Sequence, residues 1–150
     1  MKKSLIITGT ALMLLSVGTT IVHPMSINTV QAKSNKHKSI NQDLKKNLKK
    51  DKSNADNDPT NFGYTKYIES IKYTGNTSIT VNVNGAFKDL DDDVKTEVMN
   101  QAQDLAKMVL YQDNKISKSD VSDGLVIMIN NGGNSIGTTK MLNHKDYSWD

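Results

Sequence analysis

A long amphipathic segment, residues 90–114, limits the folds open to this chain more than any other part of the sequence. Its apolar residues recur at helical spacing, at Val94, Val98, Ala102, Leu105 and Val109, widened by Met99, Ala106, Met108 and Leu110. Asp91 is the expected N-cap, and Asp92 and Asp93 fall where first-turn N–H groups favour negative charge. The acidic run lacks the Gly and Glu of an EF-hand loop, so capping explains it without calcium. Gln103 lies off the apolar stripe, so we expect Gln103→Asp to be nearly silent.

The stretch before this helix, residues 66–87, predicts a β-hairpin, because β-branched residues alternate after a Gly-Asn pair. A two-residue loop would place Ile79 opposite a polar side chain. A three-residue loop beginning at Gly75 instead places Ile79 opposite Tyr73, which keeps one face apolar. We therefore expect an odd-length loop, with Gly75 or Asn76 at positive φ.

After the helix, residues 125–129 form a short continuous apolar run, which predicts a central strand covered on both faces. The element order is then strand, strand, helix, strand, strand. This order predicts an α+β, two-layer domain in which an antiparallel-rich sheet of about four strands packs on one long helix. One helix covers only one face of a sheet, so either the tail "MLNHKDYSWD" or a partner is expected on the other face.

The segment "GGNSIGTTK" has the glycine spacing of a phosphate-binding P-loop, with Gly132 and Gly137 in place. A P-loop needs Lys directly after the second Gly and a helix starting there. Here Thr138 follows that Gly, Lys140 comes two residues later, and the helical periodicity is missing. "NNGGN" therefore predicts a hairpin turn and not a nucleotide site.

The N-terminus reads as a secretory signal over residues 1–32, with two Lys, an apolar stretch and a small-residue exit before Lys33. An uncleaved membrane anchor is the alternative, because the apolar stretch is about long enough to span a bilayer. The chain contains no Cys, which excludes disulfides and a lipid-modified N-terminal Cys. The expected location is secreted or associated with the cell envelope. The leader and the basic segment after it resemble those of small exported proteins of Gram-positive bacteria.

Residues 33–61 read as a basic, disordered tether, since they hold eight Lys but no aromatic before Phe62. Ile40, Leu44 and Leu48 allow a short amphipathic helix, which three apolar side chains cannot hold alone. The tether predicts adhesion to an anionic envelope polymer or to lipid headgroups, with Lys45, Lys46, Lys49 and Lys50 as candidate residues. A solvated spacer is the alternative.

The folded domain is assigned to residues 62–150, which hold all eight aromatic residues, nine Lys and twelve acids. Because this part is acidic, we expect no nucleic-acid partner. Its sequence offers no catalytic, metal or cofactor site, because His144 stands alone in a polar tail and no Cys accompanies it. Tyr147 and Trp149 are candidate anchors for a protein partner, or else they plug the open face of the sheet.

These observations predict a small, exported, non-enzymatic binding module of the cell envelope or medium. A small extracellular hydrolase acting on wall polymer or peptide is the rival class. A structural spacer without a ligand is the third alternative.

Overall fold

A computed structural model describes residues 37–150 of the protein, so the predicted signal segment lies outside the described residues. The helical elements are α2 (Lys38–Asn54), α3 (Pro59–Phe62), α4 (Asp92–Gln112) and α5 (Lys118–Asp123), with short 3-10 turns η1 (Gly63–Lys66) and η2 (Gly85–Phe87). The strands are β1 (Ile68–Gly75), β2 (Ser78–Val83), β3 (Val126–Asn131), β4 (Asn134–Lys140) and β5 (Asn143–Trp149).

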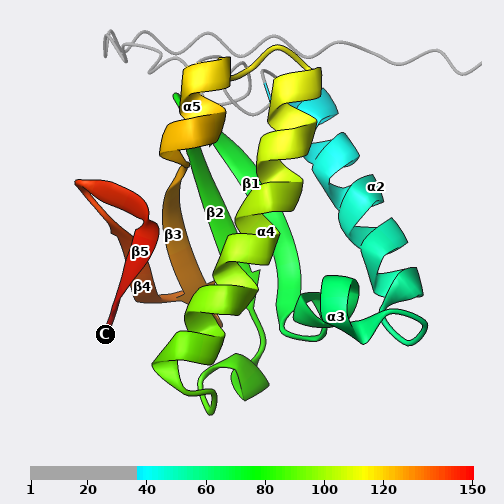
Figure 1. Ribbon diagram of the computed structural model, residues 1–150, viewed down its shortest axis with the longest axis vertical. Coiled ribbons are helices and arrows are strands. Elements are labelled where there is room, and N and C mark those ends of the chain that lie inside the picture. Colours follow the sequence, from blue (N-terminus) through cyan, green and yellow to red (C-terminus); the bar gives the residue numbers. More distant parts are fainter. Residues whose placement is uncertain (1–36) are drawn as a thin grey trace, which may run out of the picture.

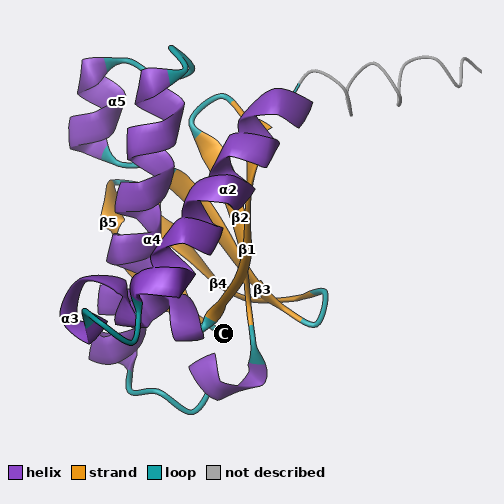
Figure 2. Ribbon diagram, turned by 90° about the vertical axis from the view of Figure 1, so that its right-hand side faces the viewer, coloured by secondary structure: helices purple, strands orange, loops and turns teal. Residues whose placement is uncertain are grey.

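The domain has two layers, a five-stranded sheet and a layer of helices, which confirms the predicted α+β class (Figure 1). The strand order follows the sequence from β1 to β5, and only the β2–β3 pair is parallel. Helices α2 and α4 lie side by side over the same face of the sheet (Figure 2). The C-terminal tail forms β5, the fifth strand, and so extends the sheet at its edge without covering the second face.

The β1–β2 hairpin has the register that burial of one face requires. Tyr73 pairs with Ile79, as predicted, but Gly75 also pairs with Ser78, so the loop is the two-residue turn Asn76–Thr77 and the predicted odd length was wrong. A register shift between Tyr73 and Gly75 accommodates the extra residue of β1. Asn76 has φ 48° and Thr77 has φ 61°, so both central residues occupy the left-handed region that such a turn needs, and Gly75 before them has φ 112°. The sequence pattern was sufficient here because slipping the register by one residue would expose every buried side chain of β2.

Strand β3 occupies the centre of the sheet, as expected, but it is covered on one face only. Ile127 and Ile129 are fully buried under the helices, whereas Val126 and Met128 are exposed on the other face. The chain itself therefore covers one face of β3, and cover of the other face by a partner stays a prediction. The β3–β4 turn at Gly132 confirms the hairpin interpretation of "NNGGN".

Helix α4 begins after Asp91, the predicted N-cap position, but the Asp91 side chain makes no capping hydrogen bond. The helix buries most of the predicted apolar stripe. Val94 and Met108 at the margins of the stripe stay largely exposed. Gln103, expected on the solvent side, is buried with 1% of its surface exposed. The buried face of α4 is therefore wider than its apolar residues alone indicate, because it also includes the polar side chain of Gln103.

The prediction of a disordered tether was wrong for the described residues of that segment. Residues 38–54 form helix α2, and its Ile40, Leu44 and Leu48 are almost completely buried in the same core as the α4 side chains. α2 packs against β1, η1 and α4 (Figure 1). The folded domain therefore begins well before Phe62. An isolated helix of this composition is marginal, but here a preformed apolar surface on β1 and α4 stabilises it.

Asn41 of α2 closes part of the β1 edge of the sheet. Its side-chain Nδ2 donates to the carbonyl of Tyr73 at 3.3 Å, and its Oδ1 accepts from the N–H of Tyr73 at 2.7 Å. The amide group thus occupies the place of a neighbouring strand for one residue. This contact satisfies a partly buried backbone pair on an edge that would otherwise be free to pair with another chain.

We expect Asn41→Leu to lower the free energy of unfolding by about 1–3 kcal/mol, because it leaves both backbone groups of Tyr73 without partners. Urea unfolding followed by circular dichroism measures the effect. Gln42→Leu, at the exposed neighbouring position on α2, is the matched control and should change stability little. Equal effects of the two substitutions would show that Asn41 does not act through the β1 edge.

Candidate functional site

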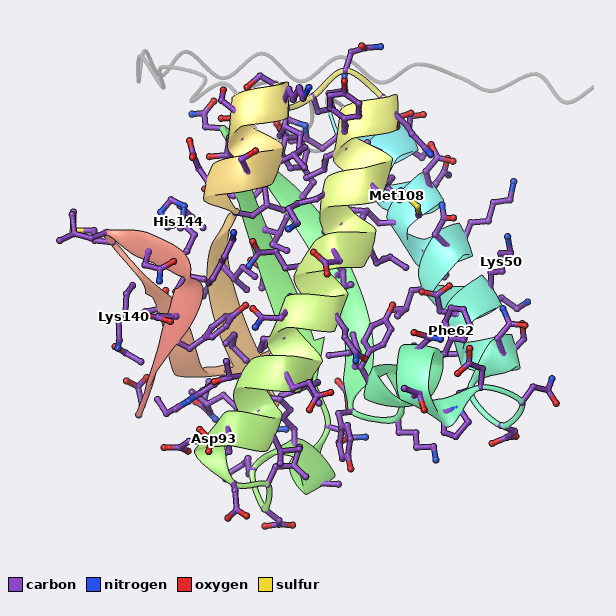
Figure 3. All side chains as sticks on the ribbon, in the orientation of Figure 1. Lys50, Phe62, Asp93, Met108, Lys140 and His144 are labelled. Atoms are coloured by element: carbon purple, nitrogen blue, oxygen red, sulfur yellow. The ribbon has the colours of Figure 1, made fainter. Side chains whose placement is uncertain are left out.

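The four candidate lysines all lie on α2 and are all exposed. At about 100° per residue, Lys46 and Lys50 fall on the flank facing α4, while Lys45 and Lys49 fall on the outer side. Figure 3 shows Lys50 pointing away from the domain. The helix that was expected to be a loose arm instead holds these four ammonium groups on a fixed ridge, which we call the α2 lysine ridge.

The α2 lysine ridge is not neutralised by ion pairs within residues 37–150. The ion pairs of this part of the chain are Lys95–Asp92 at 3.1 Å and Lys107–Asp104 at 2.7 Å, both inside α4. Lys46 and Lys50 border a groove of about 520 Å³ between α2 and α4, whose lining also includes the carboxylates of Asp43 and Asp113. The ridge therefore presents unpaired positive charge beside a groove.

Tyr147 belongs to the core, which contradicts its interpretation as an exposed anchor. Only 6% of its surface is exposed, and its ring stacks on Trp149 with 5.4 Å between ring centroids. Burial raises the pKa of Tyr147 above its ordinary range, so the phenol stays protonated. The alternative interpretation, that these aromatics plug the open sheet face, does not hold for Tyr147, because its hydroxyl forms hydrogen bonds with Gln103 and Asn100 of α4 on the helix-covered face.

Trp149 is half-buried at the end of β5 and lies directly over Gly137 of β4. A Cβ at position 137 would come within 2.7 Å of the indole ring, so the ring needs a glycine there. The Phe87 ring also packs on the indole, with 5.8 Å between the two ring centroids. The Lys95 ammonium lies 5.8 Å from the centroid of the Trp149 ring. The role of Trp149 as a partner anchor stays a prediction.

Gln103 connects three segments beneath β5. Its Nε2 donates to the carbonyl of His144 at 2.9 Å and to the Tyr147 hydroxyl at 3.1 Å. Its Oε1 accepts from the N–H of Leu125 at 3.0 Å, just before β3. The expectation that this position faces solvent was therefore wrong. The sequence contained no signal for it, because a polar residue next to an apolar stripe is normally solvated.

An open depression of about 370 Å³ lies where α2, α3, η1 and α4 meet, and two carboxylates, Asp51 and Asp104, line it. The Tyr64 hydroxyl donates to Asp51 Oδ2 at 2.7 Å. Burial raises the pKa of Tyr64 far above its ordinary range, and the hydrogen bond to Asp51 and the charge of Asp104 raise it further. The phenol is thus a hydrogen-bond donor that links η1 to α2, and sequence analysis did not anticipate this contact.

His144 lies apart from this depression. Its Nδ1 is 3.3 Å from the carbonyl of Gly124, at the end of α5. Within residues 37–150, no group of three His, Asp or Glu side chains is arranged to hold a metal ion. The helices of this part of the chain are all too short or too polar to cross a bilayer. Comparison with protein-family models, with curated proteins and with solved structures gives no match.

Proposed function

We propose that the protein is a non-enzymatic adhesion module that binds an anionic polymer of the cell envelope through the α2 lysine ridge. One observation carries the proposal: four exposed lysines stand on one ordered helix, and none of them has an ion-pair partner within residues 37–150. A fixed cluster of like charges repels itself, and a polyanion relieves that repulsion while it gains contacts.

The shape of the ridge favours a polymer over a flat bilayer. Its lysines spread over more than one side of α2, and a flexible chain can follow this curved surface on both flanks. The exposed surface of α2 offers no large apolar side chain for insertion into lipid.

Replacement of Lys45, Lys46, Lys49 and Lys50 by Gln should weaken binding of the protein to immobilised polyphosphate by roughly 100- to 1000-fold at low salt. The estimate follows from up to about 1 kcal/mol for each basic residue close to an anionic surface. Binding of the unchanged protein should also fall steeply as salt rises. Biolayer interferometry at several salt concentrations measures both effects.

A second variant with Gln at four exposed lysines outside α2 has the same net charge and serves as the control; these are Lys66, Lys72, Lys88 and Lys118. It should keep most of the affinity, because these residues come from four separate elements or loops. If the control variant loses as much affinity as the ridge variant, net charge alone explains binding and the ridge has no special role.

A further inference from the structure

The turn between β4 and β5 exposes two neighbouring apolar side chains almost completely. Met141 is 94% exposed and Leu142 is 101% exposed, whereas the next large apolar residue among those described, Met128, is 53% exposed. In Figure 1 this turn lies at the outer left margin of the domain, away from α2 and α4. We call Met141 and Leu142 the hairpin tip.

The apolar character of the hairpin tip does not serve folding. Lys140 pairs with Asn143, so the tip is a two-residue loop, a position where Asn, Gly and Asp predominate. The β3–β4 turn of the same sheet follows that rule with Gly132 and Gly133. Neither tip side chain packs on the core. Exposed apolar groups of this kind mark contact sites for membranes or proteins.

Positive charge flanks the hairpin tip on both strands. Lys140 precedes it, Lys145 follows it, and the nearest acid along the chain is Asp146. Figure 3 shows Lys140 and His144 on this hairpin. Lysine side chains beside an inserted apolar group keep their ammonium groups among lipid phosphates. We infer that the hairpin tip inserts into the interfacial layer of an anionic lipid bilayer.

A bilayer suits the hairpin tip better than a second copy of the chain does. A stable protein interface engages about 20 residues from each partner, and the tip offers two. A bilayer needs no complementary surface, and a shallow insertion keeps the turn's backbone groups near water. The tip lies at the opposite end of the sheet from the α2 lysine ridge (Figure 1). The inference therefore does not rest on the proposed function.

The absence of cysteine from the sequence permits a site-specific test on the full chain. Leu142→Cys carries an environment-sensitive fluorophore, and Ala86→Cys, exposed in η2, carries the same label as the control. With phosphatidylglycerol vesicles, the emission of the label at position 142 should shift to shorter wavelength and resist iodide quenching. The label at position 86 should stay water-accessible, even where another part of the chain holds the protein on the vesicle.

In the labelled Leu142→Cys protein, Lys140→Gln and Lys145→Gln should each lower the affinity for phosphatidylglycerol vesicles by roughly fivefold. Replacing these vesicles by phosphatidylcholine vesicles should lower the affinity further. The four α2 Lys→Gln changes should leave insertion unchanged. A label at position 142 that stays water-accessible on every vesicle overturns the inference, as does equal shielding at positions 86 and 142. A shift that appears without vesicles and grows with protein concentration would assign the tip to a second copy, and would also overturn it.

Discussion

Leu44→Asp is expected to abolish folding of the domain. Leu44 is completely buried between α2, β1 and α4, so the substitution removes a packed side chain and places an unpaired carboxylate in the core. Loss of the packed leucine side chain alone costs about 2–5 kcal/mol, and the buried charge adds several more. A small domain has only about 5–15 kcal/mol in total. Circular dichroism should show the loss of the cooperative thermal transition.

Gln42→Asp is the matched control for this change, because it introduces the same charge two residues away on the exposed side of α2. We expect it to shift stability by less than about 0.5 kcal/mol. If Leu44→Asp left the thermal transition in place, α2 would not be part of the core. In that case the lysines would stand on an arm and not on a ridge.

Gln103→Asp should destabilise the domain by about 3–5 kcal/mol, the cost of an uncompensated buried charge. The carboxylate cannot donate, so the carbonyl of His144 and the hydroxyl of Tyr147 both lose the donor that Nε2 supplies. The damage should be concentrated where β5 meets α4. Urea unfolding gives the free energy, and tryptophan fluorescence of Trp149 reports the loosening of β5.

Gln112→Asp introduces the same charge at an exposed position near the end of α4 and should cost less than about 1 kcal/mol, mostly through the helix dipole. Gln103→Glu keeps the side-chain length and still lacks the donor, so it should resemble Gln103→Asp. A neutral outcome for Gln103→Glu would mean that the hydrogen bonds of Nε2 do not hold β5.

Local patterns in the sequence were enough for the elements whose formation depends on local chemistry. The register of the β1–β2 hairpin follows from the alternation around Ile79 and from Gly75. The β3–β4 turn follows from its glycines, and α4 begins after Asp91 with Asp92 and Asp93 in its first turn. Each of these features depends on residues within about ten positions of one another, so it can be predicted from the sequence alone.

Features that depend on tertiary packing could not be predicted in the same way. Three apolar residues on α2 are too few for an isolated helix, and only the surface offered by β1 and α4 makes them sufficient. The buried Gln103 is explained by a backbone N–H, a carbonyl and a hydroxyl that lie 22, 41 and 44 residues away along the chain. The charge of the α2 lysines was evident in the sequence, but the fixed spacing of those charges on a ridge was not.

Amide hydrogen exchange under native conditions tests most directly whether α2 is an integral part of the fold. The amides of Leu44 and Leu48 should be protected to the same order of magnitude as those of Ala102 and Ala106 in α4, because the four side chains share one core. Exchange of Leu44 and Leu48 at the rate of an unstructured peptide, while α4 stays protected, would contradict the account.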